Sequence, residues 1–193
     1  RRVIYSASSS VYGDQDALPL HESMTSRPKN PYAVQKLMSE MYCSLFSELY
    51  GLDTVSLRYF NVYGPRQPET GAYATVIGIF LKPRSERAAL TIVPDGTQSR
   101  DFTHVSDIVR ANILAMERAA PFRGEVINIG TGKEYTIREV AGYVGGSTIL
   151  APARIGEARA TRADISKAKE LLGWSPRVLL PDGIETLKRG QDS

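Results

Sequence analysis

The sequence predicts an α/β fold built on a parallel sheet. Residues 3–6 form a short, mostly apolar run that is typical of a buried strand. Residues 54–59 alternate and contain β-branched side chains, which indicates a second strand. A long helical pattern lies between the two. A helix followed by a strand at this spacing is typical of a crossover between parallel strands.

The helix between these strands has clear signals at both ends. Asn30 is a good amino-terminal cap, and Pro31 suits the first helical position. Gly51 supplies a left-handed stop at the other end. The apolar positions in between recur at helical spacing: Leu37, Met38, Met41, Tyr42, Leu45, Phe46 and Leu49.

Helices and strands continue beyond Gly64 and Pro65, which interrupt the first pattern. Further strands are expected at residues 90–93 and 126–129, the second closed by a Gly-Thr-Gly turn. Ser106 is the expected cap of one helix and Gly173 the stop of another. The expected helices are residues 76–81, 106–118, 137–144 and 164–172.

The composition is that of an ordinary globular protein. The 193 residues suit one domain, or one and a part, with enough length for a real core. Apolar residues make up 42% and charged residues 23%. The net charge is only +3 and the basic residues are scattered, so nucleic-acid binding is not indicated. Scattered arginines fit an anionic small ligand better.

Cysteine, histidine and hydropathy patterns exclude several other classes. One cysteine, Cys43, allows no internal disulfide and indicates a reducing compartment, so we expect a cytoplasmic protein. His21 and His104 are far apart and lack ligand-like neighbours, so we expect no metal site. No apolar run reaches the length of a membrane span, and the first residues lack the pattern of a signal peptide. We therefore expect no membrane partner.

Tyr32 and Lys36 are the first candidates for chemistry. Four residues apart near the start of a helix, they share one helix face. An ammonium and a helix amino terminus both favour the phenolate form of a nearby tyrosine. Such a tyrosine can take a proton from an alcohol while a hydride leaves the same carbon, and can return it. Taken alone, the pair is more typical of an exposed helix face.

A serine-rich stretch strengthens this hypothesis. Residues 6–10 read S-A-S-S-S and follow the first expected strand. Hydroxyl groups at the carboxyl end of a parallel strand lie where ligands bind in open α/β sheets. By itself the stretch also fits a serine-rich turn. Its combination with N-P-Y-x-x-x-K some twenty residues later is far more specific than either part.

Six motifs occur in a familiar order: S-A-S-S-S-V-Y-G, N-P-Y-A-V-Q-K, L-R-Y-F-N-V-Y-G-P-R, S-R-D-F-T-H-V-S-D, N-I-G-T-G and A-D-I-S-K-A-K-E-L-L-G-W. With them, essentially the whole sequence resembles the extended short-chain dehydrogenase/reductases, specifically the NAD-dependent nucleotide-sugar epimerases and dehydratases. The resemblance implies the carboxyl-terminal part of a Rossmann-like parallel-sheet domain, residues 1–62 and about 99–130. It also implies a smaller α/β nucleotide-sugar-binding domain, about residues 63–98 and 131–193.

The resemblance also implies a set of site residues. Ser8, Tyr32 and Lys36 match a triad in which the serine binds the reacting sugar oxygen, the tyrosine is the acid/base and the lysine holds the nicotinamide ribose. The implied cofactor is NAD, with contacts from Ser6, Tyr32, Lys36, Tyr59 and Phe60. The implied UDP-sugar contacts are Ser8, Ser9, Ser10, Asn61, Thr75, Val76, Val93, Arg100, Arg154, Glu157 and Thr161.

These substrate contacts have different implied roles. Arg100 and Arg154 match arginines that grip the pyrophosphate, and a guanidinium suits phosphate oxygens. Asn61 matches a residue that binds the nucleotide diphosphate, and Glu157 matches a carboxylate that accepts from the nucleotide ribose. Val76 and Val93 match positions that line the pocket for the nucleotide base. Both would also be typical of an ordinary hydrophobic core.

Local differences favour one kind of family member. Ser9 and Ser10 stand where dehydratases carry an Asp-Glu pair, so water elimination lacks its acid and base. Residues 58–61 read R-Y-F-N, which looks more like UDP-hexose 4-epimerases than the R-F-F-T of uronate 4-epimerases. Thr161 and residues 71–74 resemble enzymes that also admit N-acetylhexosamines. The implied function is NAD-dependent epimerisation at C4 of a UDP-hexose through a 4-keto intermediate.

Alternatives stay open. They are another nucleotide-sugar epimerase, reductase or decarboxylase of the family, or a non-catalytic nucleotide-sugar-binding relative, against which the intact triad argues. The resemblance implies a homodimer formed through residues 37–49. The glycine-rich turn of the family's first strand and helix does not occur in these 193 residues. We therefore expect a polypeptide of only these residues to bind NAD poorly and to be inactive.

Overall fold

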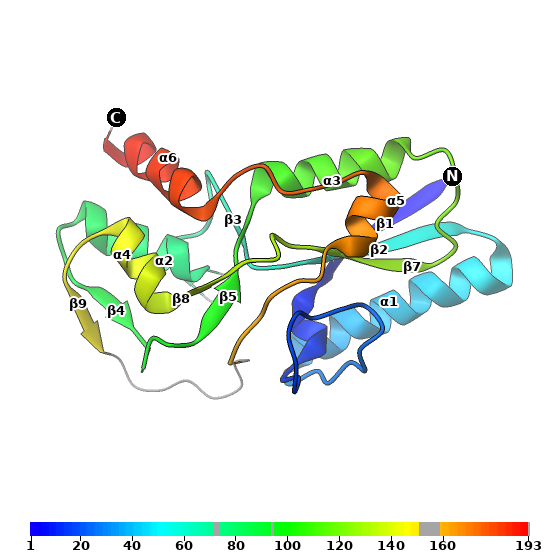
Figure 1. Ribbon diagram of the computed structural model, residues 1–193, viewed down its shortest axis with the longest axis horizontal. Helices are drawn as coiled ribbons and strands as arrows, with labels where there is room; N and C mark the ends of the chain where they lie inside the picture. The colour runs from blue at the N-terminus through cyan, green and yellow to red at the C-terminus, as the bar shows by residue number, and fades with distance from the viewer. Residues whose placement is uncertain (72–73, 94, 151–158, 193) are drawn as a thin grey trace.

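The computed structural model describes residues 1–71, 74–93, 95–150 and 159–192 of the chain. Its elements form two groups along the long axis of the molecule (Figure 1). The first group surrounds a three-stranded parallel sheet. The second packs short strands against three helices.

The three-stranded sheet has the order β1-β2-β7, and both pairs of neighbours are parallel. Its strands are Arg2–Ser8 (β1), Asp53–Tyr59 (β2) and Glu125–Ile129 (β7). Figure 1 shows one long helix on one side of this sheet and two helices on the other, namely α1 (Pro31–Tyr50) against α3 (Val105–Glu117) and α5 (Ser166–Leu172). The crossover predicted from the sequence is therefore confirmed.

Helix α1 begins and ends where its local signals predicted. Asn30 Oδ1 accepts a hydrogen bond from the Ala33 amide at 2.9 Å, and Pro31 is the first helical residue. Gly51 ends the helix in the left-handed region, with φ of 65°. Ala33 and Glu40 are the only buried residues of α1. The helix therefore rests on the sheet through a narrow strip of contacts.

One hydrophobic core lies between the sheet and helices α3 and α5. Trp174 is fully buried just beyond α5, and its Nε1 donates to the Asp107 carbonyl at 3.0 Å. Burial of apolar surface at roughly 25 cal/mol per Å² is the main stabilising contribution here. The other buried members are Val55, Leu57, Ile108, Ala111, Ala115, Phe122, Ile127, Ile129, Ala168 and Leu172.

The second group of elements has its own core. Its helices are α2 (Val76–Ser85), α4 (Ile137–Val144) and α6 (Leu180–Asp192). Three two-stranded sheets accompany them: β3 (Val62–Tyr63) with β6 (Thr103–His104), β4 (Leu90–Ile92) with β9 (Thr148–Leu150), and β5 (Ser99–Asp101) with β8 (Glu134–Thr136). The largest fully buried side chains between them are Tyr63, Ile77, Phe80, Leu90 and Leu180.

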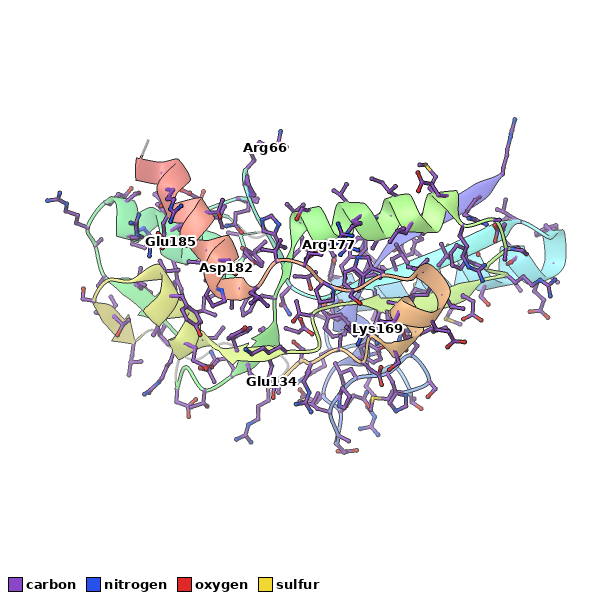
Figure 2. All side chains as sticks on the ribbon, turned by 45° about the horizontal axis from the view of Figure 1, so that its top comes forward. Arg66, Glu134, Lys169, Arg177, Asp182 and Glu185 are labelled. Atoms are coloured by element: carbon purple, nitrogen blue, oxygen red, sulfur yellow. The ribbon has the colours of Figure 1, made fainter. Side chains whose placement is uncertain are left out.

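Asp107 joins α3 to the connection that leads from α5 to α6. Its Oδ2 accepts hydrogen bonds from the amides of Arg177 at 2.9 Å and Val178 at 3.0 Å, and its Oδ1 accepts from Arg110 at 2.7 Å. Figure 2 labels Arg177 on this connection, beside α3. The carboxylate is buried, so these hydrogen bonds fix the course of the chain from one group of elements to the other.

Most of the predicted elements are confirmed, with corrections to helices α2, α3 and α5. Helix α2 continues to Ser85 instead of ending at residue 81. Helix α3 begins at Val105, and its cap is His104, whose ring accepts from the Ser106 amide; Ser106 is not the cap. Helix α5 begins at Ser166 rather than at residue 164, a difference within the usual scatter of helix ends. The sequence did not predict the 3₁₀ turn Ser9–Tyr12, the short strands β3, β5, β6, β8 and β9, or helix α6.

Asp101 is a buried carboxylate that holds together segments far apart in the sequence. Its Oδ1 accepts from the amide and the hydroxyl of Thr131, at 2.7 and 2.6 Å. Its Oδ2 accepts from the amides of Gly132 and Ala163, at 2.9 and 3.0 Å. Burial raises the pKa of Asp101, while the hydrogen bonds act in the opposite direction. The side chain thus ties the turn after β7 to Ala163, shortly before α5.

Replacing Asp101 by Asn should destabilise the protein. An amide nitrogen would face two N–H donors in place of an oxygen, and each buried donor left without an acceptor costs about 1–3 kcal/mol. We expect a loss of about 2 kcal/mol or more in the free energy of unfolding, measured by urea unfolding with Trp174 fluorescence. Asp16→Asn is the control, because that side chain is exposed and its ion pair with Arg27 contributes little. Equal stability of both variants would contradict the role given to Asp101.

Candidate active site

A cavity of about 610 Å³ lies where the two groups of elements meet. From the sheet side it is lined by most of the residues predicted to carry the chemistry, namely Ser6, Ser8, Ser9, Ser10, Tyr32, Lys36, Tyr59 and Asn61. From the side of the second group it is lined by Thr75, Val76, Val93, Arg100 and Thr161. The cavity opens at the carboxyl ends of β1 and β2, where open α/β sheets bind ligands.

Three predicted site residues are not found in this lining. Phe60 follows β2 but is fully buried, with its ring centroid 6.3 Å from that of Tyr12. It packs beneath the cavity and does not reach it. Arg154 and Glu157 lie outside the described residues, so their predicted roles stay predictions.

Ser8 ends β1 and holds the 3₁₀ turn Ser9–Tyr12 that follows it. Its Oγ accepts hydrogen bonds from the Ser10 amide at 3.2 Å and from the Ser10 hydroxyl at 2.9 Å. A hydroxyl that accepts twice still has its own proton to donate. Ser8 also lines the cavity, so its hydroxyl has a proton that it can donate to a ligand there.

Tyr32 and Lys36 come from the first two turns of α1. Tyr32 is 49% exposed, so its phenol is accessible from the cavity. The Lys36 ammonium donates to the Ser6 carbonyl at 2.8 Å and lies 5.7 Å from the centroid of the Tyr32 ring. An ammonium has three donors, so this hydrogen bond anchors it to β1 while leaving N–H groups for a ligand.

Tyr59 connects the end of β2 to α3. Its hydroxyl and the Asn112 side chain exchange hydrogen bonds at 2.9 and 3.0 Å, and the Ser6 hydroxyl lies 3.3 Å away. These contacts keep the aromatic ring at the carboxyl edge of the sheet. The ring thereby forms a fixed wall of the cavity.

Asn61, Thr161 and Asp101 form a hydrogen-bonded group beside the cavity. Asn61 Nδ2 donates to the Asp101 carbonyl at 3.0 Å and to the Thr161 hydroxyl at 3.3 Å, and the same hydroxyl accepts from the Asp101 amide at 3.3 Å. Asn61 has a positive φ of 25°, a region in which asparagine is enriched. Only 7% of Thr161 is exposed, so its main contribution is to hold Asn61 and Asp101 in place.

Besides Lys36, the basic side chains Lys29 and Arg100 line the cavity. Arg100 Nη1 donates to the carbonyls of Ser99 at 2.8 Å and Arg159 at 3.3 Å, which fixes its stem close to the chain at residue 159. Lys29, which was not predicted, pairs with Asp14. The hydrogen bond from Lys29 holds the pKa of Asp14 below its usual value. The one signal for Lys29 in the sequence is its position just before Asn30 and Pro31.

Thr75 and the valines contribute shape more than polar contacts. The Thr75 hydroxyl caps α2 by accepting from the Gly78 amide at 3.3 Å, and it donates to Gln67 at 2.9 Å. Val76 and Val93 are only partly buried, so both retain surface toward the cavity. In the part of the chain that the structure describes, no group of three or more His, Cys, Asp or Glu side chains could hold a metal ion.

A parallel sheet, a serine at a strand end and a Tyr-Lys pair at the start of the crossover helix together define a site of the short-chain dehydrogenase/reductase class. The family of NAD dependent epimerases/dehydratases matches residues 1–130. The chain therefore belongs to that family. None of the described helices combines the length and the apolar character needed to cross a membrane.

Three relatives illustrate the similarity. The UDP-glucose 4-epimerase of Mycolicibacterium smegmatis is 38% identical over 191 residues, which cover 95% of this chain and 60% of the relative. The solved UDP-N-acetylglucosamine 4-epimerase of Methanobrevibacter ruminantium M1, with UDP-N-acetylmuramic acid, is 36% identical with a TM-score of 0.88, covering 98% of this chain and 63% of that chain. The UDP-glucuronic acid 4-epimerase of Bacillus cereus, with UDP-glucuronic acid and NAD, is 36% identical with a TM-score of 0.89, covering 99% and 61%. This chain thus spans about 60% of the length of its relatives.

Proposed function

We propose that this chain carries the proton-transfer and nucleotide-sugar-binding part of an NAD-dependent UDP-hexose 4-epimerase. The observation that carries the proposal is the convergence of Ser8, Tyr32 and Lys36 on one cavity. Each has the contacts its role requires: Ser8 has a proton to donate, Tyr32 is accessible and Lys36 is anchored to β1. Relatives named as epimerases of UDP-glucose, UDP-glucuronate and UDP-N-acetylglucosamine support the same class.

The residues of the cavity divide the work of the reaction. Ser8 donates a hydrogen bond to the oxygen on the reacting sugar carbon and so orients it. Tyr32 takes the proton of the C4 hydroxyl and returns it to the same oxygen once the configuration at C4 has changed. Lys36 places its ammonium group 5.7 Å from the centroid of the Tyr32 ring, where it attracts negative charge that develops on the phenol oxygen. NAD, when bound, accepts a hydride from C4 and gives it back, so it is not consumed.

The described residues fit the nicotinamide end of NAD. The Lys36 ammonium has donors to spare for ribose hydroxyls, because its one described hydrogen bond goes to the Ser6 carbonyl. Ser6 and Tyr59 border the same part of the cavity and offer further polar and aromatic contacts. Phe60 is excluded from direct contact by its burial.

The second group of elements supplies the grip on the nucleotide. Arg100 lines the cavity and carries the charge that a pyrophosphate requires. We also assign Asn61 to the diphosphate. Both hydrogens of its Nδ2 are used by the Asp101 carbonyl and the Thr161 hydroxyl, so its side chain can donate to a phosphate oxygen only by exchanging one of these bonds. We assign Arg154 and Glu157 to the pyrophosphate and the nucleotide ribose, and Val76 and Val93 to the base. On this division the sheet with α1 serves the cofactor and the reacting end of the sugar, and the second group serves mainly the nucleotide.

Other members of the family remain alternatives for the exact reaction. A reductase or decarboxylase for nucleotide sugars would use the same proton-transfer residues, and a uronate epimerase is among the similar structures. A protein that only binds nucleotide sugars has no need of the proton relay. Incubating the complete protein with UDP-glucose, UDP-galactose, UDP-N-acetylglucosamine and UDP-glucuronate, with analysis of the products, separates these alternatives.

Replacing Tyr32 by Phe tests the proposed base. Removing a positioned acid/base group lowers kcat by about 10²–10⁴-fold, and we expect this loss with KM for the UDP-sugar changed less than about threefold. The matched control is Tyr50→Phe, a loss of the same hydroxyl from an exposed position of the same helix. Full activity of Tyr32→Phe in the complete protein would refute the assignment.

Changing the size of the side chain at position 161 tests which UDP-sugars the protein accepts. We propose that the small Thr161 leaves room for an N-acetyl group, so the wild-type complete protein should turn over UDP-N-acetylglucosamine. Thr161→Tyr should lower kcat/KM for UDP-N-acetylglucosamine at least 10-fold more than it lowers kcat/KM for UDP-glucose. Thr161→Val is the control, because it removes the hydroxyl that holds Asn61 but keeps the volume. If the wild type does not turn over UDP-N-acetylglucosamine, the proposal that Thr161 leaves room for an N-acetyl group is wrong.

We also propose that the complete protein is a homodimer through α1. Most of this helix is exposed, and its exposed face is rich in large apolar side chains: Met38, Met41, Tyr42, Leu45 and Leu49. Contiguous apolar surface of this kind is typical of an interface. Leu45→Glu with Leu49→Glu should shift the sedimentation coefficient from dimer to monomer, while Gln35→Glu, also exposed on α1, should not. A monomeric wild type would contradict the proposal.

A further inference from the structure

A buried ion pair lies between α1 and the middle strand of the sheet. Arg58 Nε donates to both oxygens of the Glu40 carboxylate, at 3.0 and 3.2 Å, and Arg58 Nη2 donates to Oε2 at 2.7 Å. The side chains are only 6% and 4% exposed. Two-pronged pairs of this kind fix direction as well as distance.

The pair lies under the catalytic face of α1. Glu40 follows Lys36 by four residues and Tyr32 by eight, so all three share one face of the helix. Arg58 lies in the central strand, in register with Ala7 of β1 and Asn128 of β7. The ion pair therefore connects the helix that carries the base to the middle of the sheet.

The same guanidinium also contacts the turn that follows Ser8. Its centre lies 4.6 Å from the centroid of the Tyr12 ring. Tyr12 is fully buried, and its hydroxyl donates to Asn128 Oδ1 at 2.7 Å. Burial raises the pKa of Tyr12 to about 12, so its hydroxyl keeps its proton. Arg58 thus lies between the two segments that carry Ser8 and Tyr32.

Glu40, Arg58 and Tyr12 do not line the cavity in the described part of the chain. They therefore act on a ligand only through other residues. Stability alone gives little reason for a charged pair here, because apolar side chains of similar volume are often as stabilising. Arg58 Nη1 is buried without a hydrogen-bond partner, which adds a cost. What the ion pair provides and apolar packing does not is orientation.

We propose that Glu40 and Arg58 are positioning residues that fix the rotation of α1 about its axis. This sets Tyr32 and Lys36 in the correct relation to Ser8. Ala33 is the other buried residue of α1. Single hydrogen bonds also join the helix to the sheet, from Lys36 to the Ser6 carbonyl and from Thr54 to the Cys43 carbonyl, but the Glu40–Arg58 pair is the buried, two-pronged contact and so restricts the rotation most. The inference rests on the proposed function where it concerns catalysis, and on the contacts alone where it concerns the helix.

The test compares Glu40→Gln with the double variant Glu40→Met, Arg58→Met in the complete protein. Glu40→Gln leaves a buried guanidinium without its counter-charge, so we expect a lower melting temperature together with at least a 10-fold lower kcat and little change in KM. The double variant should regain the wild-type melting temperature, because the buried charges are gone. Its kcat should nevertheless stay at least 10-fold low. Recovery of kcat along with stability would overturn the proposal.

Amide hydrogen exchange supplies a second measurement that does not depend on activity. In the stable double variant, exchange in the first turns of α1 and at Ser10 should be at least 10-fold faster than in the wild type, with α4 unchanged. Wild-type protection at these amides would overturn the proposal. If the wild type catalyses no epimerisation, the proposed function fails, and exchange alone still decides the positioning role.

The matched control is Asp53→Asn, which weakens another ion pair of the sheet. Arg2 Nε and Asp53 Oδ2 pair at 2.6 Å at the amino ends of β1 and β2, and neither residue lines the cavity at the carboxyl ends. This variant should lose stability but keep kcat and the protection of Ser10. A loss of kcat in Asp53→Asn equal to that in Glu40→Gln would show a general effect of destabilisation and overturn the inference.

Discussion

The parallel pairing of β1 with β2 is the constraint on which the site depends. Its register places Ser8 opposite Tyr59, so both strands end at the same edge. A parallel connection requires a crossover, and α1 is that crossover. The helix must therefore begin at the edge where β1 ends, which brings Tyr32 and Lys36 to Ser8. The hydrogen bond from Lys36 to the Ser6 carbonyl is the direct result of this topology.

The features that could be predicted from the sequence are those determined locally. Asn30, Pro31 and Gly51 set the ends of α1 by contacts within a few residues, and the predicted ends are confirmed. The strand-helix-strand order then predicts that Ser8 and Tyr32 meet, since parallel strands share an edge. Most of the candidate site follows from these two steps together with the motifs.

Features that depend on distant contacts could not be predicted. Helix α6 carries Gly183 and Gly190, which lower helix propensity, and it forms because Leu180 and Ile184 are buried in the core shared with α2 and α4. Phe60 looks like a site residue beside Tyr59, yet its ring turns into the core against Tyr12. Lys29 lines the cavity, and its ammonium is paired with Asp14 of a preceding loop. In each case the position of the side chain or helix is determined by a contact with a residue that is distant in the sequence, and local sequence patterns do not report such contacts.

Several buried polar side chains have the same structural role in this molecule. Asp101, Asp107 and the Glu40–Arg58 pair each join segments that are distant in the sequence, and each does so through several directed hydrogen bonds. Apolar burial stabilises such junctions but tolerates small shifts, because it is not directional. The proposed proton-transfer site would not tolerate them, since small displacements of reacting groups lower a rate strongly. On that proposal, directed polar contacts occur where the position of a segment, more than its burial, decides whether Ser8, Tyr32 and Lys36 meet.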